Sequence, residues 1–317
     1  MSRLSRLLKL CGVALCAAVL ATGSSAIRPA LAAGGDVTVG FAAASTGWPW
    51  YVSFIKRFNE KAAANSWKTI VLSANADVPT QLNQIYDLVA KKVDYLVVGP
   101  IDGSAVIPGL KAAHAAGIPV VVIGNPVAKE GDEYVTATRV PDDGQMGLGS
   151  AELVVQAIGD GGSVVIVDGL AGQPAVVLRH ATIDPYFKEH NIKVLGDQPA
   201  DWDSNKAATV TEDFLTRFPD VGAIFSMDGS ETPGVLRAAA DAGFKGPVIG
   251  LGGTATELAA LTSGKLYGTT CMSAGQNGEE AINALEAIVS GKPFEKTQAV
   301  VSPKVTKENA NTCPGDW

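Results

Sequence analysis

Short apolar runs rich in Val, Ile and Leu recur at regular intervals along most of the chain. Several are unbroken, such as residues 120–123 and 164–167, whereas a half-exposed antiparallel strand would alternate apolar and polar residues. The pattern therefore predicts strands that are buried on both faces of a parallel sheet. The predicted strands cover residues 37–42, 69–73, 94–98, 119–123, 163–167, 193–195, 223–225, 247–249 and 266–270.

Helical patterns separate these apolar runs. Leu82, Ile85 and Val89 recur at the spacing that brings side chains to one face of a helix. A second stripe of this kind runs over residues 282–289 and is followed by Gly291, a residue type that commonly ends helices. Strands and helices in alternation predict right-handed βαβ units and parallel sheets.

The alternation stops over residues 134–145 and then resumes. We interpret the break as the crossing between two halves of the molecule. The expected fold is therefore α/β, with two doubly wound parallel-sheet lobes rather than one very wide sheet. In such sheets ligands bind beyond the carboxyl ends of the strands, so the loops that follow the strands are the places to search for a site.

The beginning of the chain predicts a segment that is removed from the mature protein. Basic residues precede an apolar run over residues 10–21, which has the length of a signal-peptide core and is too short for a membrane span. We expect a signal peptide over residues 1–32 with cleavage after Ala32, and cleavage after Ser24-Ser25-Ala26 is the alternative. The mature protein is then expected in the periplasm.

The net charge limits the possible partners, and the cysteine content predicts a disulfide. Removal of residues 1–32 takes away four basic residues and no acidic one, so the formal net charge changes from −7 to −11. This balance repels nucleic acid and anionic membranes, and neither is expected as a partner. Only Cys271 and Cys313 remain, and such a pair commonly forms a disulfide in an oxidising compartment. Two unpaired buried thiols are the alternative.

Motifs for catalysis and for cofactors are weak throughout. His114, His180 and His190 show no metal-ligand spacing, and no Gly-x-Ser-x-Gly nucleophile elbow is present. The glycine-rich stretches at 144–149 and 250–253 each lack part of the dinucleotide-binding fingerprint, and we interpret both as tight strand-to-helix turns. We therefore expect no catalytic residue, no cofactor and no metal.

Aromatic residues cluster after two of the predicted strands. Trp48, Trp50 and Tyr51 follow the first strand, and Trp202 follows the strand at 193–195. Aromatic faces at strand ends of both lobes can sandwich a sugar ring, an aromatic ring or a cationic headgroup. Packing of a lid or of the core is the alternative reading of these residues.

Several stretches also carry a resemblance to known proteins. They include Thr-Gln-Leu-Asn-Gln-Ile at 80–85, Val-Asp-Tyr-Leu-Val-Val-Gly-Pro-Ile-Asp at 93–102, Ala-Gly-Ile-Pro-Val at 116–120, Gln-Pro-Ala-Asp-Trp-Asp at 198–203 and Phe-Ser-Met-Asp at 225–228. With these motifs the chain resembles the ribose-type, sugar-binding group of type I periplasmic solute-binding proteins, which serve ABC importers. The resemblance covers nearly all of the mature chain.

The resemblance implies two lobes joined by a hinge of three crossovers, here near residues 137–140, 271–273 and 299–302. The N-terminal lobe would comprise residues 36–138 plus 273–300, and the C-terminal lobe residues 139–272 plus 301–317. It also implies an open, empty form and a closed, ligand-bound form that a membrane permease recognises. We expect the protein to be a monomer.

Carried over position by position, the resemblance implies a pocket in which much of the family's charged set is missing. The arginine that grips the sugar falls on Val177, with Arg179 two residues further on. The usual Asn falls on Asp228, a later Asp on Gly252, and the hinge Gln on Met272. The expected ligand-binding residues are Trp48, Trp50, Tyr51, Asn125, Asp143, Val177, Arg179, Trp202, Met227, Asp228, Gly252 and Met272.

This set implies a ligand that is smaller, more apolar or differently charged than ribose. A sugar, a short polyol and a quaternary or aromatic amine all fit an aromatic pocket with a few polar groups. We expect an import receptor. A sensory binding protein that signals through a membrane kinase or chemoreceptor is the alternative, and an enzyme on the same scaffold is the third hypothesis.

Overall fold

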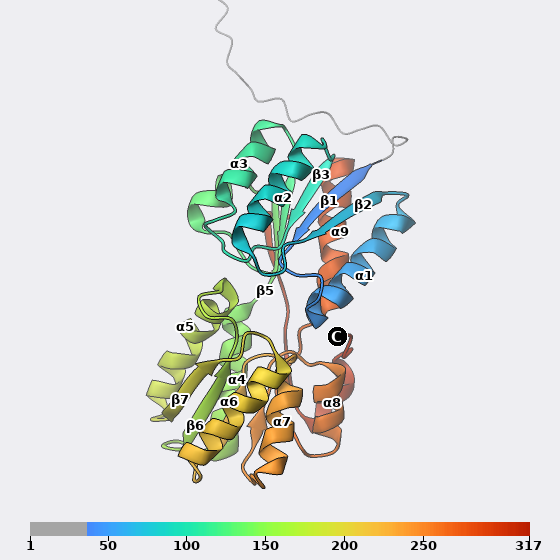
Figure 1. Ribbon diagram of the computed structural model, residues 1–317. Helices are drawn as coiled ribbons and strands as arrows, with labels where there is room; N and C mark the ends of the chain where they lie inside the picture. The colour runs from blue at the N-terminus through green and yellow to red at the C-terminus, as the bar shows by residue number, and fades with distance from the viewer. Residues whose placement is uncertain (1–36) are drawn as a thin grey trace, which may run out of the picture.

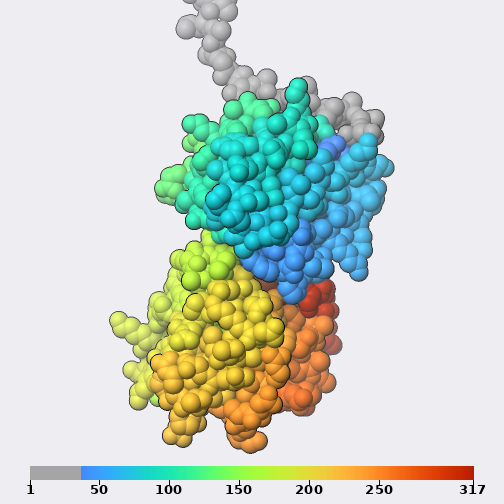
Figure 2. Space-filling view, viewed as in Figure 1, coloured from blue at the N-terminus to red at the C-terminus, as the bar shows by residue number. Residues whose placement is uncertain are grey.

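The computed structural model describes residues 37–317, which form two lobes that meet at a narrow waist (Figures 1 and 2). Each lobe is built on a parallel sheet with helices packed against it. The predicted fold class, α/β with two doubly wound parallel-sheet lobes, is therefore confirmed. The expected signal peptide over residues 1–32 lies outside the described residues.

The first lobe contains a six-stranded sheet in which all neighbours are parallel, in the order β11-β5-β4-β3-β1-β2. Its strands are β1 (Thr38–Ala43), β2 (Lys68–Ser73), β3 (Tyr95–Val98), β4 (Val120–Ile123), β5 (Ala137–Pro141) and β11 (Thr297–Val300). Its helical elements are α1 (Pro49–Ala64), α2 (Val78–Ala90), α3 (Ile107–Ala115), the 3-10 helix η1 (Lys129–Tyr134) and α9 (Ala274–Ser290).

Alternate residues of the central strands enter two separate apolar clusters. Val97 and Val121 belong to the cluster that also contains buried residues of α1 and α9, whereas Leu96 and Val120 belong to the one under α2 and α3. Because both faces of the sheet are covered, every position in these strands favours an apolar side chain. This explains the unbroken apolar runs of the sequence.

The second lobe has a parallel sheet in the order β7-β6-β8-β9 and a small antiparallel pair, β10 with β12. Its strands are β6 (Ser163–Asp168), β7 (Lys193–Pro199), β8 (Ala223–Ser226), β9 (Val248–Ile249), β10 (Thr269–Thr270) and β12 (Lys304–Val305). Its helical elements are α4 (Asp143–Ile158), α5 (Pro174–Glu189), α6 (Ser204–Arg217), α7 (Thr232–Asp241), α8 (Ala255–Thr262) and the 3-10 helix η2 (Lys307–Thr312).

The described chain passes between the lobes where β5 leads into α4, where β10 leads into α9, and where β11 leads into β12. These crossings lie at or beside the three predicted hinge positions. The residue limits of the two lobes stay a prediction. Next to the second crossing, Cys271 and Cys313 form a disulfide, with 5.8 Å between their Cα atoms, which is the pairing that the sequence favours.

Gly144, Gly147 and Gly149 do not form the turn that we expected, because they lie within the first turns of α4. A Cβ atom on Gly147 would stand only 2.7 Å from the carbonyl oxygen of Arg179 on α5. The missing side chain therefore lets two helices pack closely, and the interpretation of this stretch as a strand-to-helix turn is wrong. Over residues 37–317, no helix combines the length and the apolar character needed to cross a membrane.

Candidate ligand-binding site

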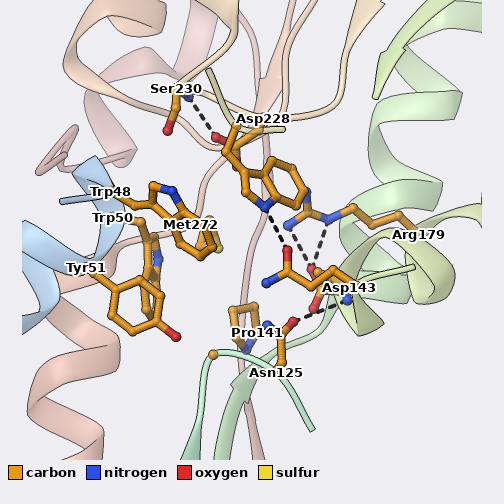
Figure 3. A pocket seen from close by; sticks show the side chains of 14 residues that line it. Trp48, Trp50, Tyr51, Asn125, Pro141, Asp143, Arg179, Asp228, Ser230 and Met272 are labelled. Atoms are coloured by element: carbon orange, nitrogen blue, oxygen red, sulfur yellow. Dashed lines mark hydrogen bonds and ion pairs between the residues drawn. The ribbon is translucent and has the colours of Figure 1, made fainter. Parts of the chain in front are cut away.

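A cavity lies between the lobes, where loops at the carboxyl ends of strands in both sheets come together (Figure 3). Its volume of about 80 Å³ is several times the roughly 10–15 Å³ that one water needs, so it can enclose a small solute. Nine of the expected residues line it: Trp48, Trp50, Tyr51, Asn125, Asp143, Arg179, Trp202, Asp228 and Met272.

The first lobe contributes an aromatic wall that is fixed by packing. Pro49 opens α1 and places Trp50 and Tyr51 in its first turn. The ring centroids of Trp50 and Tyr51 are 5.0 Å apart in an edge-to-face arrangement, and Trp48 lies 6.1 Å from Tyr51. Burial raises the pKa of the Tyr51 phenol, which therefore stays neutral. The wall thus offers apolar faces without a charge.

Facing this wall, the second lobe contributes a buried ion pair (Figure 3). Nε and Nη2 of Arg179 each lie 2.9 Å from Oδ1 of Asp143, and Nη1 donates to the carbonyl oxygen of Met227 at 2.8 Å. Burial raises the pKa of Asp143, and the charge of Arg179 opposes this rise. Oδ2 of Asp143 is buried without a hydrogen-bond partner among the described residues.

Trp202 is held in place by several groups around it. Its backbone N–H donates to Oε1 of Glu231 at 2.9 Å, and its indole N–H donates to Oε1 of Gln173 at 2.7 Å. Asp201 and Trp202 both have left-handed backbone angles, with φ of 55° and 62°, which non-glycine residues adopt at a cost. The hydrogen bonds offset this strain and fix the ring beside the cavity.

Asn125 connects the two lobes directly. Its side-chain nitrogen donates to the carbonyl oxygen of Pro100 at 2.9 Å, within the first lobe. Its side-chain oxygen accepts the backbone N–H of Ala175, in the first turn of α5, at 3.2 Å. Because this second bond crosses the cleft, it exists only while the lobes are close together. The structure therefore shows a closed arrangement.

Buried acidic groups lie on one side of the cavity. Oδ1 of Asp228 accepts the backbone N–H of Ser230 at 2.8 Å, and burial raises the pKa of this carboxyl. Behind it, burial and then the nearby Asp228 raise the pKa of Glu231 well above its usual value. Burial also raises the pKa of Glu257, to about 7. These shifts reduce the negative charge that this side presents to a guest.

The chain is similar to known proteins along most of its length. A family model described as a periplasmic binding protein domain matches residues 39–293. This chain belongs to the periplasmic binding protein family. It is similar to the ribose import binding protein RbsB of Bacillus subtilis, with 29% identity over 83% of this chain and 85% of that protein. It is also similar to a xylitol-binding protein of Mycolicibacterium smegmatis, with 28% identity over 79% of this chain and 72% of that protein.

Solved structures share the fold of this chain. An ABC transporter solute-binding protein from Mycobacterium smegmatis with bound glycerol superposes with a TM-score of 0.81 and 25% identity, covering 88% of this chain and 96% of that one. A solute-binding protein from Bacillus halodurans with bound myo-inositol gives a TM-score of 0.82 at 22% identity, covering 89% and 99%. The family model and the ribose-binding relatives confirm the resemblance inferred from the sequence motifs.

Three expected residues do not line the cavity of this periplasmic binding protein. Val177 is 57% exposed on α5, because residues 177 and 179 point about 200° apart around a helix and Arg179 takes the inward position. Met227 is fully buried and contributes only its carbonyl oxygen, to Arg179. Gly252 faces Trp317, whose ring atoms come within 2.7 Å of the position that a Cβ would take.

The cavity also contains residues that the sequence did not single out: Gly124, Pro141, Gln173, Ala175 and Ser230. Gln173 and Ser230 lie in strand-end loops that the sequence marked for inspection, so their position was a usable signal. Their residue types were not a usable signal, because polar residues are common in loops.

One group of side chains in residues 37–317 has metal-ligand geometry, and it lies outside the cavity. It joins Asp168 on β6, His180 on α5 and Asp197 on β7. Nε2 of His180 lies 3.2 Å from Asp168 and 3.6 Å from Asp197, and the hydrogen bond to Asp168 is the main reason that the pKa of His180 rises to about 9. A protonated His180 therefore pairs with these two aspartates, and we interpret the group as an ion-pair cluster.

Proposed function

We propose that this protein is the solute-capturing component of an ABC importer and that its ligand is a small sugar or polyol. The two lobes close on the solute, and the closed form is presented to a membrane permease. The family, the interlobe cavity and the names of the relatives, which bind ribose or xylitol, support this assignment. Periplasmic location after removal of residues 1–32 and a monomeric state belong to the same proposal.

The observation that favours a hydroxylated ligand is a pair of buried polar atoms without partners. Among residues 37–317, the indole N–H of Trp50 is a donor that lacks an acceptor, and Oδ2 of Asp143 is an acceptor that lacks a donor. A hydroxyl group both donates and accepts, so a polyhydroxylated solute can satisfy both atoms. An ammonium group could donate to Asp143 but could not accept from Trp50. This favours a sugar or polyol over the amine that the aromatic residues alone permit.

The sensory alternative has no support of its own. The relatives described above are named for import or for the solute that they bind, and none of them is named as a sensor. An import function therefore remains the proposal.

A thermal-shift panel tests the ligand class. Probes are D-ribose, D-allose, xylitol and glycerol, with choline as the cationic comparison. A ligand that binds only the folded chain at 100 times its Kd stabilises it by about 2.7 kcal/mol, which raises Tm by several degrees. At least one hydroxylated probe should do so. A shift with choline and with none of the others would overturn the proposal.

A pair of substitutions then tests the mechanism of recognition. Trp50→Phe keeps the aromatic face and removes the unpartnered N–H, so it should weaken binding of the hydroxylated probe by about two- to tenfold. Trp67→Phe is the matched control, because Trp67 stacks on Tyr95 and does not line the cavity, and its affinity should stay near that of the wild type. Equal affinities for the two variants would contradict the role assigned to Trp50.

A further inference from the structure

Residues 313–317, which we call the clasp, lie at the waist between the lobes. In Figure 1 the C-terminal end of the ribbon lies between α1 and α8, and in Figure 2 its red atoms lie next to the blue atoms of α1. The disulfide between Cys271 and Cys313 fixes the start of the clasp to the second lobe. Beyond this point the clasp makes specific contacts with both lobes.

Asp316 attaches the clasp to the first lobe. Its carboxylate accepts hydrogen bonds from Ser273 Oγ at 2.7 Å and from the backbone N–H groups of Ala274 and Gly275 at 3.2 and 2.8 Å. These groups form the first turn of α9, where unpaired N–H groups and the helix dipole favour an anion. The carbonyl oxygen of Asp316 also accepts from the hydroxyl of Ser53 on α1.

Trp317 attaches the clasp to the second lobe. Its carbonyl oxygen accepts the backbone N–H of Ala255, at the start of α8, at 3.1 Å. Its ring rests on two glycines, since Cβ atoms on Gly252 and Gly229 would lie 2.7 and 3.2 Å from ring atoms. A side chain at Gly252 would collide with the indole, and one at Gly229 would press against it.

The same residue contacts the wall of the cavity from behind. The indole N–H of Trp317 donates to the carbonyl oxygen of Met272 at 2.6 Å, and Met272 lines the cavity. Gly229, under the ring, lies between Asp228 and Ser230, which also line it. Trp317 therefore supports two pieces of the binding site without being part of its lining.

From this arrangement we propose that Asp316 and Trp317 are positioning residues that hold the lobes closed around the solute. The clasp joins α9 of one lobe to α8 of the other across a crossing of the hinge. A rotation that separates these helices must break one of its two attachments. The free energy of these contacts is then added to the closed state alone and shifts the population toward it. This inference rests on the proposed function, because it concerns retention of a bound solute.

Release kinetics test the proposal, with xylitol as the probe. Asp316→Ala and Trp317→Ala should each release xylitol about tenfold faster, with an association rate within about twofold of the wild type, because stabilisation of a closed complex acts mainly on dissociation. Asp316→Asn keeps an oxygen acceptor without the charge and should give an intermediate rate. Glu308→Gln is the control, since Glu308 is an exposed residue just before the clasp, and it should behave as wild type.

A solute-free measurement separates this proposal from the proposed ligand class. Small-angle scattering of the empty protein should give a larger radius of gyration for Asp316→Ala than for the wild type, and amide exchange at Gly275 should be faster. If xylitol does not bind the wild type, the choice of ligand fails and the scattering comparison alone decides about the clasp. Equal scattering and equal release rates in correctly folded variants would overturn the proposal.

Discussion

Gly169, at the carboxyl end of β6, offers a direct test of whether the position of Trp202 matters. A Cβ atom on Gly169 would lie 1.8 Å from Cη2 and 2.0 Å from Cζ3 of the indole, far inside any normal carbon–carbon contact. Gly169 is not among the glycines with positive φ, so alanine is compatible with its backbone. Gly169→Ala should therefore displace the Trp202 ring and leave the strand intact.

The size of the effect follows from what the ring does. An aromatic face stacked on a bound solute contributes about 1–2 kcal/mol, so displacing it should weaken binding by about five- to thirtyfold. The indole also loses its hydrogen bond to Gln173, which costs about 1 kcal/mol of stability and lowers Tm by about 2–4 °C. The variant should therefore remain folded at room temperature.

A double-mutant cycle measured by calorimetry distinguishes this mechanism from a general disturbance. In the Trp202→Ala background the indole is absent, so the Cβ of Gly169→Ala has room and should add little further loss. The double variant should bind the solute about as well as Trp202→Ala alone. Two single effects that simply add in the double variant, or an unchanged affinity for Gly169→Ala, would refute the reasoning.

Other predictions concern stability and the surface. Replacing Cys271 and Cys313 by Ser should lower the free energy of unfolding by about 4 kcal/mol in the chain-entropy model for a separation of 42 residues, and urea denaturation that shows equal stability would contradict it. The hydrogen bond to Asp168 raises the pKa of His180 from 6.5 to about 9, so its stabilising contribution is fully present below about pH 6.5 and is lost as the pH rises toward about 9. His180→Asn should flatten this part of the pH–stability curve, and an unchanged slope would count against the ion-pair cluster. Val177→Ser should leave solute affinity and Tm unchanged because Val177 is exposed, and a clear loss of affinity would place it in the site after all.

The strands that the sequence predicted well are those covered by helices on both faces. The run at 120–123 coincides with β4, where every position is buried. In contrast, β5 and β11 were not predicted as strands. β5 alternates between buried and half-buried positions, and β11 is exposed at three of its four residues because it forms the edge of its sheet. Because they have no continuous apolar run, the sequence does not distinguish these strands from loops.

The candidate site shows the same division between local and long-range information. Trp50 and Trp202 could be placed because parallel sheets bring the carboxyl ends of their strands to one edge, whereas Arg179 was placed through the resemblance. The position of Trp317 could not be predicted in this way. The disulfide brings the end of the chain to this place, and the ring packs on two glycines that are distant from it in sequence. Gly252 was expected in the pocket because the resemblance places an Asp of the family there, whereas in the structure it faces the ring of Trp317. The periodic pattern of apolar residues in a sequence does not show which side chain packs between two loops.

The unpartnered atoms of the cavity also bear on how closing depends on the solute. In the closed form the indole N–H of Trp50 and Oδ2 of Asp143 have no hydrogen-bond partner among residues 37–317. A buried polar atom that is left without any partner costs about 1–3 kcal/mol. Hydroxyl groups of a solute that reach these atoms remove that cost. The groups that select a hydroxylated solute are then the groups that make closing depend on it.

The contacts of Asp316 and Trp317 act in the opposite direction, since they favour the closed state whether or not a solute is present. A permease that recognises the closed form would thus meet mostly loaded protein only if the cost at the cavity exceeds the stabilisation at the clasp.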